Sequence, residues 1–139
     1  VSDQAQKPRR MEPVPTLVTQ PFWDGTREHQ LLLQWCTACE KPIFYPRESC
    51  PGCFGDTLEW RPASGRGEIY AVTVEHRPQI TSLQAEEPFG VVLVELEEGV
   101  RMMSNVIDCA PDDVTVGMKV MVAWEPLSDG RNLPQFRPV

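Results

Sequence analysis

The sequence predicts a mainly β protein in which a short N-terminal helix and a small metal-binding ribbon precede a five-stranded barrel. Three observations lead to this expectation. Four of the five cysteines stand in two C-x-x-C pairs separated by residues 40–49. Short runs of apolar residues recur after residue 65 with the spacing of strands. The 14 prolines among 139 residues favour short strands and turns over a helical bundle.

Three segments of the chain differ in composition. Residues 1–18 hold three prolines and little apolar material, which is typical of a linker within a longer polypeptide, although a processed start would look the same. Residues 19–62 carry the predicted helical approach segment and the ribbon, and residues 63–139 carry the barrel. The Gly-rich turn at 64–67 separates these two parts, because the pattern of apolar residues changes there.

A helix is expected after Thr19, which can cap it, because Pro21 lacks only an N–H group that a first turn leaves unpaired. The helix should end near His29. Three short strands then alternate with the two cysteine turns, which is the layout of a zinc ribbon; they are predicted at residues 31–35, 43–45 and 58–60.

Five further strands follow, at residues 68–76, 89–96, 100–107, 119–125 and 133–139. Alternation in the first of them places Tyr70, Val72 and Val74 on one face. Prolines in the last confine it to a sheet edge. Because no long helix separates the five strands, we expect them to pack as a closed or partly closed Greek-key barrel of the OB type.

The cysteine turns predict a metal site. Cys36 and Cys39 form one C-x-x-C turn, and Cys50 and Cys53 form the other. Together the turns complete the tetrahedral shell that Zn²⁺, or iron in its place, prefers. No position is left for water or substrate, so the predicted zinc is structural. Two redox pairs or two disulfides are the alternative, which the close spacing of the pairs disfavours.

The rest of the sequence indicates in which cellular compartment the chain is expected. No signal-peptide pattern opens it, and no run approaches the roughly 18 apolar residues of a membrane span. We therefore expect a cytoplasmic protein with reduced thiols and no membrane contact. The fifth cysteine, Cys109, is expected to be a small buried apolar residue, with a reactive thiol as the alternative.

The net charge of −7 argues against a nucleic-acid partner. Residues 1–62 carry 7 Lys/Arg and 8 Asp/Glu, whereas residues 63–139 carry 6 and 12. A nucleic-acid binder normally needs a basic face to neutralise phosphates, and the barrel half has a charge of −6 (6 minus 12). Single-stranded nucleic acid therefore remains the least favoured partner, although zinc ribbons and OB folds both serve that use.

No pattern of residues predicts catalysis. His29 and His76 have no Ser, Cys or carboxylate at a spacing that suggests a triad. The pairs Glu86–Glu87 and Glu97–Glu98 are expected to be solvated charges in turns rather than acid–base groups. The segment 64–67 has neither a P-loop lysine nor a Rossmann pattern, and is better explained as a turn into the barrel.

Aromatic residues gather around the metal-binding turns. Trp35 and Trp60 flank the cysteines, where bulky side chains commonly cover a small ribbon, and stacking platforms for bases are the alternative. An exposed aromatic pair on the approach segment could anchor another protein, since Trp is enriched at binding hot spots. The residues proposed to bind a partner on this ground are Phe22, Trp23, Phe44 and Tyr45.

Several motifs occur together in a specific combination. They are Pro21-Phe22-Trp23, Leu33-x-x-Cys36-x-x-Cys39, Phe44-x-Pro46-Arg47, Cys50-Pro51-x-Cys53, Ser64-Gly65-Arg66-Gly67, Val91-x-Leu93-Val94-x-Leu96, Glu98-Gly99-Val100, Gly117-Met118-x-Val120 and Leu133-Pro134-x-Phe136. In these motifs the sequence resembles the zinc-ribbon/OB-fold acyl-CoA-associated family, long described as a domain of unknown function. One departure is Glu40, where the family usually has Gly, a residue that relaxes the backbone of the turn.

The resemblance implies a fold and a role. The fold is a helical approach segment, a rubredoxin-like zinc ribbon and an OB barrel. The role is that of a non-catalytic accessory domain that supports a thiolase or thiolase-like aldolase acting on acyl-CoA, as a subunit or fused to a hot-dog-fold hydratase. Within the family, the chain is similar to the C-terminal domain of hydratase subunits of bacterial steroid side-chain degradation, where the partner performs retro-aldol cleavage of a hydroxyacyl-CoA.

Direct binding of acyl-CoA is the alternative function. The phosphates of CoA require Arg or Lys, and the candidates in the barrel half are Arg66, Arg77 and Arg101. Neither the acyl group nor the identity of the partner follows from the sequence.

Overall fold

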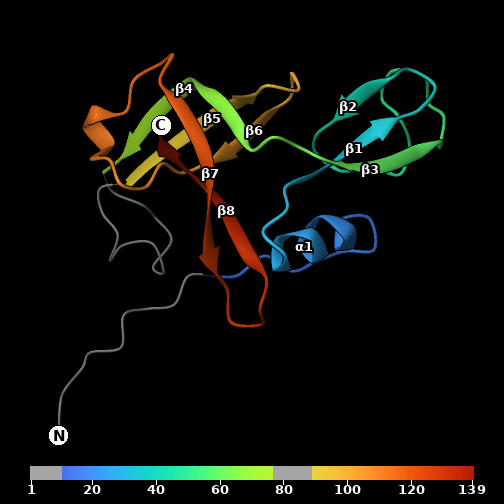
Figure 1. Cartoon of the computed structure of the whole chain (residues 1–139), viewed down its shortest axis with the longest axis horizontal. Coiled ribbons are helices and arrows are strands. Elements are labelled where there is room, and N and C mark those ends of the chain that lie inside the picture. Colours follow the sequence, from blue (N-terminus) through green and yellow to red (C-terminus); the bar gives the residue numbers. More distant parts are fainter. Residues whose placement is uncertain (1–10, 77–88) are drawn as a thin grey trace, which may run out of the picture.

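The computed structural model describes residues 11–76 and 89–139. Within these ranges the chain forms one helix, a small three-stranded sheet and a curled five-stranded sheet, and the helix packs against a strand of each sheet (Figure 1). The elements are α1 (Gln20–Arg27), β1 (Leu32–Cys36), β2 (Lys41–Ile43), β3 (Leu58–Pro62), β4 (Arg66–Glu75), β5 (Phe89–Leu96), β6 (Arg101–Ser104), the 3₁₀ turn η2 (Pro111–Asp113), β7 (Lys119–Pro126) and β8 (Asn132–Pro138). None of the helices in the described ranges is long and apolar enough to cross a bilayer.

The small sheet is the predicted ribbon. Its strand order is β2-β1-β3, and both pairings are antiparallel. β2 begins two residues earlier than expected, because Cys36 at the end of β1 pairs with Lys41 directly across the first cysteine turn. Phe44 and Tyr45 therefore follow the strand instead of belonging to it.

The larger sheet is the predicted five-stranded barrel, in the order β6-β5-β4-β7-β8. It curls until its two edges meet: Val106, just after β6, forms a parallel bridge with Phe136 of β8. The Phe136 N–H group donates to the Asn105 carbonyl at 2.9 Å, and the Ile107 N–H group donates to the Phe136 carbonyl at 2.7 Å. The result is a half-closed OB barrel with β8 at an edge, as its prolines predict.

One predicted strand face is wrong. The register between β4 and β5 shifts between Ile69 and Ala71, so a β-bulge turns the side chains of that stretch over. Ile69 is 1% exposed in the core, whereas Tyr70 is 46% exposed on the outside. There the Arg101 guanidinium lies over the Tyr70 ring, 3.6 Å from its centroid.

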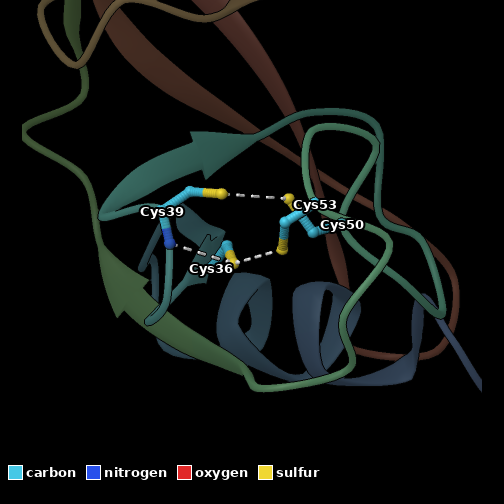
Figure 2. Close-up of side chains that lie close together, drawn as sticks. All are labelled: Cys36, Cys39, Cys50 and Cys53. Carbon is cyan, nitrogen blue, oxygen red and sulfur yellow. Dashed lines mark hydrogen bonds between the residues drawn. The ribbon is translucent and has the colours of Figure 1, made fainter.

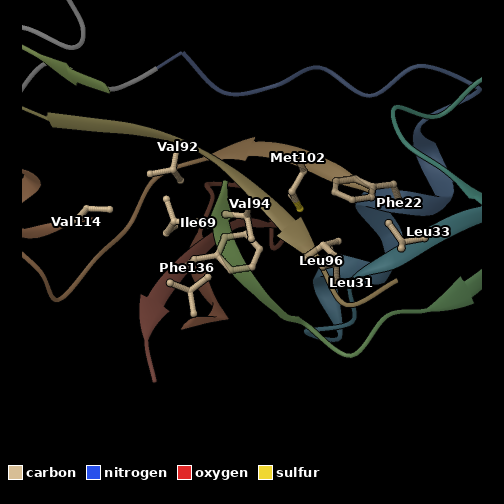
Figure 3. Close-up of a cluster of buried hydrophobic side chains, with 11 residues drawn as sticks. Phe22, Leu31, Leu33, Ile69, Val92, Val94, Leu96, Met102, Val114 and Phe136 are labelled. Carbon is tan, nitrogen blue, oxygen red and sulfur yellow. The ribbon is translucent and has the colours of Figure 1, made fainter. Parts of the chain in front are cut away.

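A single hydrophobic core joins the helix, the ribbon and the barrel (Figure 3). Phe22 of α1 and Leu33 of β1 belong to the same buried cluster as Ile69 and Phe136 of the barrel. Leu33 and Phe136 are 1% and 0% exposed, and full burial of such a side chain contributes about 1.5–3 kcal/mol. The ribbon is therefore held by the barrel's core as well as by its own cysteines.

Helix α1 packs against β1 and β8. Pro21 lies in its first turn as predicted, and Thr19 occupies the N-cap position. The Thr19 hydroxyl makes no capping bond to the helix and instead accepts from the Thr16 N–H group at 2.8 Å. Gly25 permits the close approach of β1, since a Cβ atom there would lie 2.8 Å from Leu32.

Candidate metal centre

The two cysteine turns repeat one backbone geometry. Cys36 ends β1, and the Glu40 N–H group donates back to the Cys36 carbonyl at 2.8 Å. In the second turn the Phe54 N–H group donates to the Cys50 carbonyl, also at 2.8 Å. Both Glu40 (φ 53°) and Phe54 (φ 61°) adopt the left-handed conformation, which Gly adopts without steric cost. The strain expected at Glu40 is thus present, and Phe54 shares it.

This geometry brings the four thiols together (Figure 2). All four sulfur atoms lie within 4.8 Å of one another. The Sγ atoms of Cys36 and Cys53 are 3.6 Å apart, and those of Cys50 and Cys39 are 3.9 Å apart. Zn–S bonds of about 2.3 Å in a tetrahedron require sulfur separations of about 3.8 Å. The donor set and its dimensions therefore fit a four-coordinate zinc.

Burial of the cysteines is uneven. Cys36 and Cys50 are buried, Cys39 is half-buried and Cys53 is exposed. Ile43 and Leu58 pack around the buried pair. The cluster is consequently shielded from solvent on the side of the ribbon sheet and open to solvent at Cys53.

Hydrogen bonds shift the acidities of two thiols in opposite directions. Backbone N–H groups of Cys53 and then Gly52 lower the pKa of Cys50 to about 7; the Gly52 bond is 3.3 Å long. Hydrogen bonds with Cys53 and then Cys36 raise the pKa of Cys39 to about 12. Cys50 and Cys39 therefore differ in acidity, and a bound metal ion must displace the protons that the thiols carry.

Cys109 lies outside the cluster. It is half-buried and packs against the barrel core, and its thiol faces the Ala110 carbonyl at 3.6 Å.

The four aromatic residues predicted to bind a partner contact one another in series. Phe22 meets Trp23 and Phe44 at centroid distances of 5.1 and 6.3 Å, and Phe44 meets Tyr45 at 4.4 Å. Phe22 is buried in the shared core, Trp23 and Phe44 are half-buried, and Tyr45 is 54% exposed. Much of this aromatic surface is therefore used to join the helix to the ribbon.

The structure describes two of the three predicted CoA-binding arginines, Arg66 and Arg101. Arg66 lines an open pocket of about 660 Å³ together with Lys119, but Lys119 pairs with Glu68 at 2.6 Å. Glu95 and Glu97 line the same pocket, so its charge is mixed. Arg101 lies over Tyr70 instead, and Arg77 falls outside the described residues.

The histidines and paired glutamates that were considered for catalysis are described next by their contacts and exposure. The His29 ring stacks on Trp124 at 5.7 Å, and His76 is exposed at the end of β4. The Glu98 carboxylate accepts a hydrogen bond from the Ser64 N–H group at 2.9 Å, while Glu86 and Glu87 lie outside the described residues.

Sequence reasoning missed Arg131, which is 5% exposed. Its position after the Ser-Asp-Gly turn was the available signal, but two of its contacts, the Pro13 carbonyl and the Trp23 ring, come from distant parts of the chain.

A four-thiol ribbon that shares its core with a half-closed OB barrel defines the zinc-ribbon/OB-fold class of proteins. Residues 23–59 match the family described as the rubredoxin-like zinc ribbon domain of ChsH2, and residues 60–125 match its C-terminal OB-fold domain. The chain belongs to this ChsH2-type DUF35 family.

Three curated relatives illustrate the family. A "Probable enoyl-CoA hydratase alpha subunit" of Thermomonospora curvata is 36% identical over 96% of this chain and 42% of its own length. A "3-oxo-4,17-pregnadiene-20-carboxyl-CoA hydratase alpha subunit" of Mycobacterium tuberculosis is 31% identical over 91% of this chain and 43% of its own length. A "DUF35 domain-containing scaffold protein" of Methanocaldococcus jannaschii is 35% identical over 77% of both chains. The chain thus spans less than half of either hydratase subunit.

A solved structure shares the complete architecture. The chain of the "Ltp2-ChsH2(DUF35) aldolase" superposes with a TM-score of 0.81 at 31% identity, covering 91% of this chain and 98% of that one.

Proposed function

We propose that this chain is a zinc-stabilised accessory domain that binds and supports a thiolase-fold aldolase or thiolase acting on acyl-CoA. The observation that carries the proposal is the four-thiol cluster. Four protein ligands fill the coordination shell of Zn²⁺, so the ion would hold the ribbon together without offering a position to substrate. Such a site supports folding, and the chemistry would come from the partner.

The relatives support the choice of partner. One relative is named a DUF35 domain-containing scaffold protein. The similar solved structure is named an aldolase, and its name includes a DUF35 chain. We infer that the present chain has the same kind of partner, with retro-aldol cleavage of a steroid side-chain hydroxyacyl-CoA as the reaction. The hydratase names of two relatives further suggest a fused or associated hot-dog-fold hydratase. Four reduced thiols suit the cytoplasm, where we place this role.

Two measurements test this proposal. Metal analysis of the folded chain should find about one zinc per chain, and less than about half an equivalent would contradict the structural site. A thiolase-fold aldolase such as Ltp2 should be soluble and active in the presence of this chain and lose one or both properties in its absence. An aldolase that is stable and fully active alone would remove the main content of the proposal.

Acyl-CoA binding by the chain itself is the second candidate. The pocket beside Arg66 is the observation in its favour, although the neighbouring carboxylates would repel CoA phosphates. Calorimetry with an acyl-CoA on the isolated chain decides between the two: micromolar binding that an Arg66→Ala change weakens would favour this second function.

A further inference from the structure

The four-thiol cluster is open to solvent at one of its ligands. Cys53 is the exposed cysteine of the four, whereas Cys36 and Cys50 are buried. The next residue, Phe54, is 83% exposed, so its ring covers little of the neighbouring sulfur. A small oxidant dissolved in water can therefore reach the Cys53 sulfur directly, while the ribbon shields the sulfur atoms of the buried pair.

Two glycines of the second cysteine turn keep side chains away from the cluster. A Cβ atom at Gly55 would lie 3.4 Å from the Cys53 sulfur. A Cβ atom at Gly52 would lie 3.6 Å from the Cys50 sulfur. Any other residue at these positions would place carbon against the sulfur atoms, so the open side of the cluster is built into the sequence of residues 50–55.

The cysteines also differ in the hydrogen bonds that their sulfur atoms accept. The Cys39 N–H group donates to the Cys36 sulfur at 3.4 Å, and the Gly52 N–H group donates to the Cys50 sulfur at 3.3 Å. In the part of the chain that the structure describes, no N–H group donates to the Cys53 sulfur. Because such bonds stabilise the negative charge of a thiolate, the Cys53 sulfur should keep more of its nucleophilicity than the two buried ones.

We propose that Cys53 is an oxidation site of the metal centre, at which a hydroperoxide reacts first, and that Cys36 is the resolving cysteine. The inference rests on the zinc site of the proposed function and is independent of the partner. A cysteine that binds a metal ion is already a thiolate, which is the form that peroxides oxidise. Exposure then decides which of the four thiolates reacts.

The reaction is balanced by hydrogen peroxide and two thiolates. The Cys53 sulfur attacks one peroxide oxygen and the O–O bond breaks, which gives a sulfenic acid and one hydroxide. The Cys36 sulfur lies 3.6 Å from the Cys53 sulfur. It attacks the sulfenic acid at sulfur, so that a disulfide forms and a second hydroxide leaves. Peroxide gains the two electrons that the thiolates lose.

Oxidation in this way would release the metal ion. The disulfide removes two of the four ligands, and two thiolates cannot complete the tetrahedral shell of Zn²⁺. The ribbon then loses the cross-link between its two cysteine turns, whereas the barrel keeps its own core residues. A dithiol reductant returns the disulfide to two thiols and is itself oxidised, so added zinc should restore the site.

Peptide mass spectrometry of the zinc-loaded chain tests which cysteine reacts first. Hydrogen peroxide is added at less than one equivalent together with dimedone, which traps sulfenic acids. We expect the label at Cys53. Cys109 is the internal control, because it is a half-buried thiol outside the cluster. Labelling of Cys109 or of another cluster cysteine ahead of Cys53 would overturn the inference, and without dimedone a disulfide other than Cys36–Cys53 would overturn the role of Cys36.

Matched ligand substitutions test the same point by kinetics. Cys53→His and Cys39→His each leave three cysteines and one histidine, a set that also binds structural zinc. Zinc released by peroxide is followed with a chromogenic chelator. We expect Cys53→His to slow the release at least about tenfold and Cys39→His to change it less than about threefold. Equal rates in two zinc-loaded variants would contradict the inference, and the labelling of the wild type decides if either variant fails to bind zinc.

The outcomes separate this inference from the proposed function. A folded wild-type chain that contains no zinc overturns the structural metal site and the oxidation site together. A zinc-loaded chain that keeps its metal at one equivalent of peroxide overturns the oxidation site alone. Zinc that is lost to peroxide but not rebound after treatment with dithiothreitol would contradict the reversible disulfide.

Discussion

Thr26 and Asn132 make two hydrogen bonds to each other across 106 residues of sequence. The Asn132 N–H group donates to the Thr26 hydroxyl at 3.1 Å, and the Asn132 side-chain amide donates to the Thr26 carbonyl at 2.8 Å. The Thr26 hydroxyl in turn donates to the Trp23 carbonyl at 2.6 Å. Both residues are buried, at 0% and 6% exposure. This pair therefore fixes helix α1 on the first residue of β8.

Replacing Thr26 with Val should destabilise the chain by about 1–3 kcal/mol, because the buried Asn132 N–H group loses its acceptor while the shape of the side chain is kept. Urea unfolding measures the change. Thr37→Val is the matched control, since its exposed hydroxyl also donates to a carbonyl, that of Thr57, and its loss should cost less than about 1 kcal/mol. Equal effects of the two changes would contradict the buried role of Thr26.

Cys36→Ser should abolish zinc binding and unfold the ribbon, because metal binding in such a site contributes directly to folding. The barrel strands keep their own core residues, so we expect partial unfolding, visible in amide NMR spectra as loss of dispersion for residues 32–62. Cys109→Ser should retain one zinc per chain. A folded ribbon in the Cys36 variant without metal would count against a structural ion.

Glu40→Gly should stabilise the chain by about 0.5–1 kcal/mol. Relief of the left-handed conformation gains about 1–2 kcal/mol, and the greater freedom of unfolded Gly takes back part of it. The exposed ion pair of Glu40 with Arg61, at 3.6 Å, contributes little at high salt. Glu48→Gly lacks the positive φ and should instead destabilise, so thermal unfolding of the two variants should shift in opposite directions.

Asp129→Asn should reveal a pH-dependent contribution to stability. The hydrogen bond from Arg131, and more weakly the charge of Arg27, hold the pKa of Asp129 below its usual 3.8. Because the pKa is lowered in the folded state, the stabilisation is present above 3.8 and disappears as the pH falls through the folded value. The difference between wild type and variant should therefore be largest at about pH 7 and shrink towards about pH 3. A constant difference across urea titrations would contradict this role.

Trp23→Ala and Tyr45→Ala should separate folding from binding. Trp23 is half-buried and contacts Phe22 and Arg131, so its truncation should cost about 1–3 kcal/mol of folding stability. Tyr45 is 54% exposed, and its loss should change unfolding by less than about 1 kcal/mol. A change in aldolase affinity caused by Tyr45→Ala in a stably folded chain would support the aromatic partner surface. Unchanged affinity would remove Tyr45 from it.

Local patterns predicted much of this molecule. The cysteine cluster follows from two short turns whose spacing alone places the thiols, and β5 matches the predicted residues 89–96 because a continuous apolar run has clear ends. Features that depend on distant residues were not predictable in the same way. The bulge that exposes Tyr70 depends on the register between β4 and β5. The burial of Phe22 depends on barrel residues that lie more than forty positions further along the chain.

The shared core has a mechanical consequence. The two family domains meet between residues 59 and 60, inside β3, which pairs with β1 from Leu58 to Pro62. Leu31 and Leu33 beside this junction are 3% and 1% exposed and pack with barrel residues. The junction between ribbon and barrel is therefore packed on both sides and should not act as a hinge. A subunit that binds the ribbon would consequently also fix the orientation of the barrel.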